Sequence, residues 1–473
     1  MHHLDQYYID GQWVAPVAGG TTMEIVNPAT EGVIGTLALG TTADVDRAVA
    51  AARAAFLTWS ATSREERLAV LTRIIEVYKT RMEEMGVAIH EAIGAPLWLA
   101  KSNHVQLGAQ FLASAVAALK EMTFSKTAGK TEVVSEAIGV AALITPWNWP
   151  AATVAGKVGY ALAAGCTVVL KPSEVSPLDA RIFAEVIHAA GVPAGVFNMV
   201  YGEGPVVGAA LARHPDVDVI SITGSTRAGC QVAADAAPTV KRVLQELGGK
   251  SPNVILDDAN LKTAVSDGVI SVMINSGQTC VAPTRMLVPR HLMEQAVAIA
   301  GATASALKCG DPTQPDTKVG AVANRAQFEK IRRLIATGIE EGAQLVAGGT
   351  DLPEGVKKGH FVRPTVFSLA DNQATIAREE IFGPVLAMIP YDSEEEAIAI
   401  ANDTEYGLAA YIQSTDAARA RRVAGRLRAG SVRINGAAAD LSAPFGGYKR
   451  SGNGRELGIH GLSEFLELKA IAG

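Results

Sequence analysis

Hydrophobic and polar positions divide the chain into an N-terminal part and two later series of alternating segments. Residues 6–40 contain short alternating segments such as YYIDGQWV with turn residues between them, and this pattern predicts β-strands. Residues 43–56 and 63–92 carry apolar positions at helical spacing with charged residues on the opposite faces, which predicts two amphipathic helices.

From residue 138 onward, predicted strands alternate with predicted helices. The helices carry the expected end signals, since Pro205 lies in the first turn of one helix and Gly191 ends another. Such alternation predicts a parallel sheet with right-handed crossover connections. The predicted strands are 139–145, 167–171, 196–202, 218–224 and 241–247, and the helices between them are 153–164, 176–191, 205–214 and 225–237.

A second α/β series runs from about residue 253 to residue 440. Gly248 and Gly249 separate it from the first series and predict a hinge. Together the two series predict an α/β fold with two open α/β domains that face each other. The strands predicted in the second series are 253–258, 284–289, 360–367 and 385–391, with a helix across 261–276.

Composition excludes some classes of function. A chain of 473 residues, 48% hydrophobic and 19% charged, exceeds one ordinary core, so two or three domains are expected. The net charge of −6 and the lack of a strongly basic stretch argue against nucleic acid as a partner. The most apolar stretch, 138–170, is interrupted by prolines, an asparagine and a lysine, which argues against a membrane span.

Cysteine usage and the N-terminal residues bear on the compartment. The four cysteines show neither CxxC spacing nor a disulfide framework, which fits a reducing compartment. The segment MHHLDQYYIDGQWV lacks the basic and apolar regions of a signal peptide. We therefore expect a cytoplasmic protein, and we expect no metal site.

Cys280 is the candidate nucleophile. It follows an apolar helical run and lies among small and polar residues in NSGQTCVAPTR, where a thiolate can attack a carbonyl. Most free cysteines are small buried hydrophobic residues, so the residue alone does not establish catalysis. Cys166 and Cys230 are predicted to pack in that ordinary way, and Cys309 lacks a catalytic neighbour.

Two further motifs offer the groups that a nucleophilic thiol needs. Asn148 lies in TPWNWP after a predicted strand, where flanking tryptophans and prolines would hold its amide as a rigid oxyanion donor. Glu246 lies in QELGGKSPN at a strand end, where adjacent glycines suit a carboxylate that swings to act as general base for water. Each has an ordinary alternative, because Asn148 could cap the next helix and Glu246 could lie in a surface turn.

Three segments of the first series predict an anion or nucleotide site. ITGSTRAG (222–229) joins a strand through a Gly–Ser turn to a helix start, where backbone N–H groups and the helix dipole favour a pyrophosphate. KPSE (171–174) places a cation, a hydroxyl and a carboxylate after a buried strand, where an adenosine ribose could lie. GEGPVVG (202–208) is one residue longer than the dinucleotide fingerprint and predicts a strand-to-helix turn near the adenine.

In this order and over essentially the whole chain, the motifs resemble those of the aldehyde dehydrogenase superfamily. The resemblance implies a homodimer or homotetramer of subunits with a Rossmann-like NAD-binding domain (1–119 and 139–247), a catalytic domain (248–450) and a small β oligomerisation element (120–138 and 451–473). The motifs that carry it are TPWNWP, KPSE, TGSTRAG, ELGGKSPN, GQTC, EEIFGPV (379–385) and PFGGYKRSGNGRELG (444–458).

The resemblance also implies residue roles, motif by motif. Cys280 is the nucleophile, Glu246 the general base, and Asn148 with the Cys280 backbone N–H the oxyanion hole. Lys157 matches a lysine behind the catalytic glutamate and is assigned to a proton relay. The expected cofactor contacts are Thr145, Trp147, Lys171, Ser173, Glu174, Gly204, Gly224, Ser225, Gly229, Leu247, Glu380 and Phe382, with Lys171 and Glu174 at the adenosine ribose, Ser225 at the pyrophosphate, Glu380 at the nicotinamide ribose and Phe382 at the nicotinamide.

The implied reaction oxidises an aldehyde to a carboxylic acid with reduction of NAD. Cys280 forms a thiohemiacetal, hydride departs to the nicotinamide, and water activated by Glu246 hydrolyses the resulting thioester. Glu174 would accept hydrogen bonds from a ribose 2′-hydroxyl and repel a 2′-phosphate, so NAD is expected. Lys171 partly offsets this repulsion, and NADP is the alternative.

Small residues around the predicted substrate tunnel favour a bulky aldehyde, aromatic or long-chain. Ala152, Thr153 and Gly156 follow the asparagine motif, residues 437–439 are all alanine, and no arginine in these segments marks a carboxylate-bearing semialdehyde. The alternative is that neighbouring aromatic side chains swing in and refill the space. The residues expected to line the tunnel are Trp149, Thr153, Thr279, Val281, Ala439 and Phe445.

Two other functions compete with this interpretation. A CoA-acylating semialdehyde dehydrogenase would transfer the acyl group to CoA, but such relatives generally lack the general-base glutamate, and Glu246 is present. A structural protein derived from the family would not require Cys280, Glu246 and Asn148 together.

Overall fold

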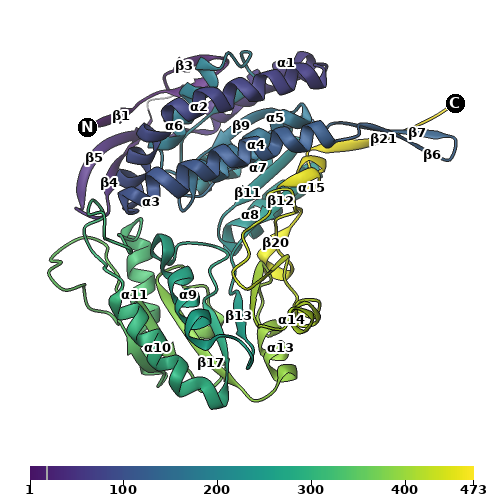
Figure 1. Cartoon of the computed structure of the whole chain (residues 1–473). Coiled ribbons are helices and arrows are strands. Elements are labelled where there is room, and N and C mark those ends of the chain that lie inside the picture. Colours follow the sequence, from purple (N-terminus) through teal and green to yellow (C-terminus); the bar gives the residue numbers. More distant parts are fainter. Residues whose placement is uncertain (18–19) are drawn as a thin grey trace.

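The computed structural model describes residues 1–17 and 20–473, which form two lobes and a projecting β-element (Figure 1). The first lobe, in purple and blue, contains an eight-stranded sheet, and the second lobe, in green, contains a seven-stranded sheet. The two open α/β units predicted from the sequence are confirmed. None of the described helices is long and apolar enough to cross a membrane.

The eight-stranded sheet has the parallel order β12-β11-β8-β9-β10 at its centre. Short antiparallel strands complete it, with β20 beside β12 at one edge and the β2–β3 hairpin beside β10 at the other. Its strands are β2 (Tyr7–Ile9), β3 (Gln12–Val14), β8 (Val140–Ile144), β9 (Thr167–Lys171), β10 (Phe197–Met199), β11 (Val219–Thr223), β12 (Arg242–Glu246) and β20 (Gly452–Asn453).

Helices cover both faces of this sheet, and their ends follow the sequence signals. Ser63 and Glu66 form a reciprocal capping box at the start of α2, and Gly94 ends that helix in the left-handed conformation. The helix predicted after Gly204 begins with a π-helical turn before it becomes α7. The helices of this lobe are α1 (Thr42–Trp59), α2 (Arg64–Ile93), α3 (Leu97–Leu99), η1 (Ala100–His104), α4 (Val105–Glu121), α5 (Pro150–Ala164), α6 (Leu178–Ala189), η2 (Gly204–Gly208), α7 (Ala209–Arg213), α8 (Thr226–Ala236), η3 (Ala237–Thr239), η6 (Lys449–Ser451) and α15 (Gly458–Ser463).

The seven-stranded sheet is parallel except for its edge strand β15, which pairs antiparallel with β16. Its order is β15-β16-β17-β14-β13-β18-β19. The strands are β13 (Pro252–Ile255), β14 (Arg285–Pro289), β15 (Gln344–Ala347), β16 (Thr365–Ser368), β17 (Val385–Tyr391), β18 (Ala409–Gln413) and β19 (Ser431–Ile434), and the helices are α9 (Leu261–Met273), η4 (Ile274–Gly277), η5 (Arg290–Leu292), α10 (Met293–Ala306), α11 (Arg325–Glu340), α12 (Thr375–Arg378), α13 (Glu394–Asn402) and α14 (Ala417–Ala424).

Two predicted boundaries in this lobe were wrong. The helix expected across 261–276 stops at Met273, because Asn275 and Ser276 adopt positive φ angles of 51° and 55°. The strand expected across 360–367 begins only at Thr365, since Pro364 before it lacks the N–H that a strand position inside a sheet needs. The early end of α9 matters for the site, because the turn that follows it leads to Cys280.

A three-stranded sheet projects from the first lobe (Figure 1). The hairpin β6 (Ser125–Ala128) and β7 (Thr131–Ala137) pairs with the C-terminal strand β21 (Leu466–Ala472). Of the segment 451–473, only β21 belongs to this sheet, because β20 pairs with β12 and α15 packs on α4 and α5. A second small sheet joins β1 (His2–Leu4), β4 (Thr22–Asn27) and β5 (Gly32–Ala38).

The cysteines outside the proposed site differ in their surroundings. Cys166 is buried, and burial is the main cause that raises its pKa to about 12, so its packing role is confirmed. Cys230 was also expected to pack, but it lies exposed on the outer face of α8, so that prediction was wrong. Cys309 is half-buried, and its thiol donates to the Val362 carbonyl.

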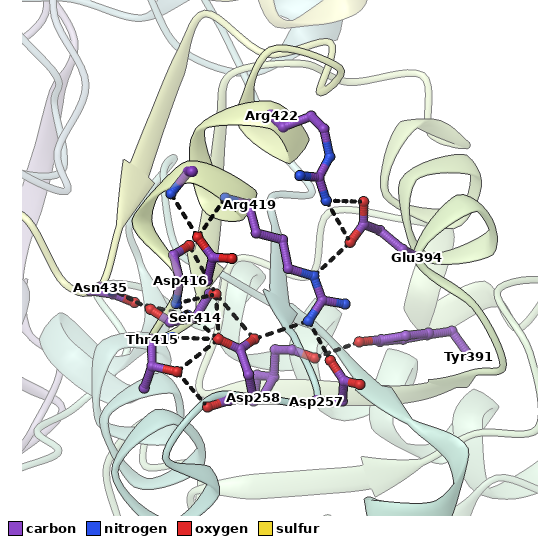
Figure 2. Close-up of polar contacts among 12 residues, drawn as sticks. Asp257, Asp258, Tyr391, Glu394, Ser414, Thr415, Asp416, Arg419, Arg422 and Asn435 are labelled. Carbon is purple, nitrogen blue, oxygen red and sulfur yellow. Dashed lines mark hydrogen bonds and ion pairs between the residues drawn. The ribbon is translucent and has the colours of Figure 1, made fainter.

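A polar network at the end of β13 ties α14 to the seven-stranded sheet (Figure 2). The Asp258 carboxylate accepts hydrogen bonds from the Ser414 hydroxyl and from the backbone N–H groups of Thr415 and Asp416, at 2.8–2.9 Å. Arg419 contacts both Asp258 and Glu394. Burial raises the pKa of Asp258, but the hydrogen bonds outweigh it and lower the pKa to about 2.

We expect Asp258→Asn to lower the urea midpoint of unfolding at neutral pH, with a loss on the order of 1–2 kcal/mol, because an ionised acceptor of several hydrogen bonds is lost. The folded-state pKa lies below that of an unfolded aspartate, so the stabilisation is full above the unfolded pKa and disappears as pH falls towards about 2. The control is Asp392→Asn, in an exposed pair with Arg290. Equal losses for the two variants would contradict the expected role.

Candidate active site

One cavity of about 400 Å³ is lined by residues of both lobes. It brings together segments that are far apart in the sequence: the turn after β8, the end of β12, the loop after α9 and the loop before β17. The predicted residues that line it are Trp147, Asn148, Trp149, Thr153, Gly224, Ser225, Glu246, Leu247, Thr279, Cys280, Val281, Glu380, Phe382, Ala439 and Phe445.

Asn148 lies in the turn between β8 and α5. The N-cap of α5 is Trp149 rather than Asn148, so the alternative role of Asn148 as a helix cap is excluded. Its amide Nδ2 donates to the Gln278 carbonyl at 2.9 Å, and the side chain is 5% exposed. An amide carries two N–H donors, so one remains for an oxygen in the cavity.

The loop that carries Cys280 is shaped by two residues in the left-handed conformation. Asn275 and Ser276 both have positive φ, which ends α9 and turns the chain back towards Asn148. Gln278 holds the turn from within, because its amide donates to the Asn275 carbonyl at 3.0 Å and accepts from the Ala323 N–H at 2.9 Å. The loop is therefore fixed by its own side chains before any substrate arrives.

A buried histidine that the sequence did not single out supports both sides of the cavity. His104 stacks on Trp149, with ring centroids 4.2 Å apart, and its Nε2 bonds to the Asn275 side chain at 3.3 Å. Asn275 in turn donates to the Asn148 carbonyl at 2.7 Å, and Trp149 donates to the Thr279 hydroxyl at 3.0 Å. Complete burial lowers the pKa of His104 to about 3, so the ring is neutral and donates from Nε2.

Glu246 ends β12 inside the molecule rather than in a surface turn. One of its carboxylate oxygens is buried and accepts no hydrogen bond from the described residues. Burial raises its pKa well above the usual range, and the nearby Glu456 carboxylate raises it further. A carboxylate in such surroundings gains from taking up a proton, which is the property of a general base that works near neutral pH.

The Cys280 thiol is half-buried in the cavity wall, and its pKa is raised. Burial is the main cause, and the negative charge of Glu246 adds to it. In this arrangement the thiol holds its proton at neutral pH, with Glu246 as a neighbouring acceptor. Gly249 allows the segment after β12 to approach the Cys280 loop closely, because a Cβ at this position would lie 2.5 Å from the Cys280 carbonyl oxygen. The predicted hinge at these glycines stays a prediction.

Lys157 lies behind Glu246 and outside the main cavity. Its ammonium group donates to the Ser221 hydroxyl at 2.7 Å and to the Glu456 carboxylate at 2.5 Å. Glu456 lines the cavity and interacts electrostatically with Glu246. The sequence did not single out Glu456, although it stands in the PFGGYKRSGNGRELG motif. Lys157, Glu456 and Glu246 therefore form a charged group next to the thiol, in which Lys157 and Glu246 are buried and Glu456 is half-buried.

The wall on the other side of Cys280 comes from the loop before β17. Glu380 accepts a hydrogen bond from the Gly249 N–H at 2.8 Å, and burial raises the pKa of its carboxyl. Phe382 has a positive φ of 58° and meets Trp147 edge to face, at 5.6 Å between ring centroids. Lys330, which the sequence did not indicate, donates to the Glu380 carbonyl at 2.7 Å and also lines the cavity.

The helix start at α8 faces the same cavity. Ser225 is the N-cap of α8 and accepts from the Ala228 N–H, and Gly224 beside it lines the cavity. Gly229 does not line the cavity: a Cβ there would lie 2.5 Å from Leu247, so its role in the structure is close packing.

Other predicted cofactor residues lie outside the cavity wall, beyond the ends of β8, β9 and β10. Lys171 forms an ion pair with Glu174 at 2.8 Å, and the Ser173 hydroxyl accepts from the Val175 N–H. Thr145 donates its N–H to the Lys171 carbonyl, while its own hydroxyl is buried without a partner among the described residues. Gly204 faces open space.

The part of the cavity predicted to hold the substrate, here called its substrate half, differs in part from that prediction. Ala152, Thr153 and Ala439 line it, as expected from their small size. Gly156 does not widen it, because Phe111 occupies the space 2.8 Å from a Cβ at that position. The residues that the sequence did not indicate are mainly apolar, with one cation among them: Leu107, Phe111, Arg433, Leu441 and Leu457.

The chain matches the model of the aldehyde dehydrogenase family over residues 13–471. It therefore belongs to the aldehyde dehydrogenase family. Among curated relatives, it is 51% identical to the 3-succinoylsemialdehyde-pyridine dehydrogenase of a Pseudomonas species, over 100% of this chain and 99% of the relative.

Solved structures agree with this membership. A mutant of aldehyde dehydrogenase C from Pseudomonas syringae, in complex with NAD+ and octanal, is 53% identical and superposes with a TM-score of 0.98 over 99% of this chain and 96% of that one. A Mycobacterium tuberculosis aldehyde dehydrogenase in complex with NAD+ is 39% identical, with a TM-score of 0.96 over 100% and 98% of the two chains.

We expect His104→Ala to lower kcat about tenfold without changing the KM for cofactor, because Asn275 and Trp149 lose a buried support that positions Asn148 and Thr279. Steady-state kinetics with one aldehyde measure this, and thermal unfolding identifies any general loss of stability. His188, which is exposed and contacts Tyr8, provides the matched control, and His188→Ala should leave kcat unchanged. An unchanged kcat in His104→Ala would refute the positioning role.

Proposed function

We propose that this chain oxidises an aldehyde to a carboxylic acid with NAD+, through a covalent thioester on Cys280. The observation that supports the proposal is the arrangement of three groups around one cavity: the half-buried thiol of Cys280, the raised-pKa carboxylate of Glu246 and the amide of Asn148. A thiol beside a proton acceptor and opposite a fixed N–H donor can add to a carbonyl and hold the oxyanion that forms.

The first step forms the carbon–sulfur bond. The Cys280 thiol gives its proton to Glu246, and its sulfur attacks the aldehyde carbon to give a thiohemiacetal. The free N–H of the Asn148 amide and the backbone N–H of Cys280 donate to the developing oxyanion. His104 and Gln278 hold these donors in place, so little reorganisation is needed in the transition state.

The residues around the cavity fit a dinucleotide. Ser225 at the start of α8 suits the pyrophosphate, since backbone N–H groups there are available to an anion. Glu380 and Phe382 suit the nicotinamide ribose and the nicotinamide on the wall beside Cys280. When bound, NAD+ supplies the acceptor for the hydride that leaves the thiohemiacetal carbon.

The second step hydrolyses the thioester. Glu246 takes a proton from water, and the hydroxide attacks the acyl carbon while the Cys280 sulfur leaves. Glu456 and Lys157 lie next to Glu246 and can pass the proton outward, because Lys157 joins Glu456 and Ser221 in one hydrogen-bonded chain. Such a path carries away the proton that Glu246 took from the thiol, so Glu246 is charged again before it takes a proton from water. That second proton then returns to the Cys280 sulfur as it leaves.

The carboxylate of Glu174 supports NAD over NADP. A carboxylate at the adenosine ribose accepts from the 2′-hydroxyl and repels a 2′-phosphate. In this structure the carboxylate pairs with the Lys171 ammonium group at 2.8 Å, which partly offsets that repulsion. The NAD+ complexes of the Pseudomonas syringae and Mycobacterium tuberculosis relatives are in line with this preference.

The substrate is a bulky aldehyde, long-chain or aromatic. Phe111, Trp149, Leu441 and Phe445 offer apolar contact, while Ala152 leaves room beside them. The octanal complex of the Pseudomonas syringae relative supports a long chain, and the name of the Pseudomonas 3-succinoylsemialdehyde-pyridine dehydrogenase supports a ring.

The subunits assemble as a homodimer or homotetramer. The projecting sheet leaves Leu468 and Ile471 exposed, and its edge strands β6 and β21 have free backbone groups that a second copy can cover. The division into NAD-binding, catalytic and oligomerisation domains follows from the same proposal. Free thiols on Cys230 and Cys309 fit a cytoplasmic setting.

The proposed reaction is tested by NADH formation with aliphatic, aromatic and ω-oxo-acid aldehydes. Cys280→Ala should abolish NADH formation, and Asn148→Ala should lower kcat on the order of a hundredfold or more, because an oxyanion donor is lost. The matched control is Cys230→Ala, an exposed cysteine outside the site. Turnover that survives in Cys280→Ala would exclude the nucleophile, and acyl-CoA formation on addition of CoA would replace hydrolysis by acyl transfer.

The pH dependence of kcat tests Glu246. A general base works in its deprotonated form, so activity should be present above its pKa and fall as pH drops through it. Because burial and Glu456 raise this pKa, the fall should occur at a higher pH than the 4.5 of an ordinary glutamate. Glu246→Gln should lower kcat by about 10²–10⁴ and remove this limb of the profile.

The matched control for this profile is Glu329→Gln, in an exposed pair with Arg325, which should keep the wild-type kcat and pH dependence. A Glu246→Gln enzyme with the same rising limb as wild type would show that another group titrates.

A further inference from the structure

Arg433 is a cation that lines the catalytic cavity together with apolar residues such as Leu441 and Phe445. It lies in β19, and it lines both the catalytic cavity and a second cavity of about 440 Å³ beside it. The second cavity has Asn260, Asp267 and Gln413 among its walls, and it does not reach Cys280. Arg433 therefore stands at the boundary between the two cavities.

The position of Arg433 is linked to that of the nucleophile through one residue. Its guanidinium carbon lies 5.8 Å from the centre of the Tyr411 ring, and the two residues are partners on neighbouring strands. The Tyr411 hydroxyl donates to the Val281 carbonyl at 2.8 Å, directly after Cys280. One aromatic side chain thus fixes the cation relative to the loop on which the substrate is held.

The guanidinium of Arg433 has no hydrogen-bond acceptor within the part of the chain that the structure describes. Among residues 1–17 and 20–473 it forms neither an ion pair nor a side-chain hydrogen bond, although it is half-buried. Arg285 and Arg419 show the usual pattern, since the first donates to backbone carbonyls and the second to carboxylates. Five N–H donors in a fixed fork, partly removed from water, favour an oxygen acceptor supplied by a ligand.

We infer that Arg433 is a specificity residue for aldehydes whose far end carries an oxygen acceptor, a carboxylate or a ketone. The inference rests on the proposed function, because it places the aldehyde group at Cys280 and the distal oxygen at Arg433. The apolar walls between these two points contact the connecting chain or ring. Octanal and other purely apolar aldehydes fill the same cavity without engaging the guanidinium.

The test compares aldehydes of one length that differ only at the far end: octanal, 7-oxooctanal and 8-oxooctanoate, with shorter ω-oxo acids down to four carbons. Arg433→Leu should lower kcat/KM for at least one acceptor-bearing aldehyde by about tenfold or more, and leave octanal within about twofold, because a charge-assisted hydrogen bond is lost only there. Arg433→Lys should retain part of the preference, since the charge remains but the fork is lost.

The matched control is Arg428→Leu. The guanidinium carbon of Arg428 also lies over a tyrosine ring, 5.3 Å from the ring centre of Tyr448, but Arg428 does not line the catalytic cavity. The Arg428→Leu variant should leave kcat/KM unchanged for every aldehyde tested. A uniform loss for all aldehydes in Arg433→Leu, or no loss for any acceptor-bearing one, would overturn the inference. So would a change of assembly state in Arg433→Leu by size-exclusion chromatography, which would assign the cation to a subunit contact.

Failure of the proposed function gives a different result. If the wild type forms NADH with none of these aldehydes, the proposed reaction is wrong, and the role of Arg433 is then decided by binding. Isothermal titration of octanedioate and octanoate should show that Arg433→Leu weakens the dicarboxylate about tenfold relative to the monocarboxylate. Equal weakening of the two ligands would reject the specificity role whatever reaction the protein performs.

Discussion

The hydrogen bond from the Asn148 amide to the Gln278 carbonyl joins the two lobes at the point where the chemistry occurs. Asn148 follows β8 of the first sheet, and Gln278 precedes Cys280 on the loop after α9 of the second lobe. A second bond, from Asn275 to the Asn148 carbonyl, closes the connection. Because both contacts are buried, moving either lobe would leave polar groups unpaired, which is costly. The oxyanion donor and the nucleophile are therefore set at a fixed separation.

Burial at this junction also sets the protonation of the reactive groups. Cys280, Glu246 and Glu380 share one water-poor region, and burial raises the pKa of each. Charge repulsion there favours the protonated thiol, and the raised pKa of Glu246 makes its carboxylate a ready acceptor for that proton. Lys157 with Glu456 supplies the compensating cation behind Glu246. The same desolvation that stabilises the proton on the thiol strengthens every hydrogen bond made to an oxyanion.

The cavity separates recognition from reaction along its length. Near Cys280 its polar groups are few and fixed, whereas the walls beyond Trp149 are apolar. Tyr411 spans the two regions, since it touches the loop of Cys280 with its hydroxyl and Arg433 with its ring. A change of substrate can thus be accommodated at the far wall without moving the groups that carry out the chemistry.

The sequence by itself determined the α/β architecture and the main members of the site. Strand and helix periodicity predicted nearly every parallel strand, because buried strands and amphipathic helices have distinct spacings. Asn148, Glu246 and Cys280 followed from motifs at strand ends, where ligands meet open sheets. Only the tertiary structure decided the outward position of Cys230, the filling of space at Gly156 by Phe111, and the presence of His104 and Arg433 at the site. These depend on which side chains meet across distant segments, and local spacing does not encode that.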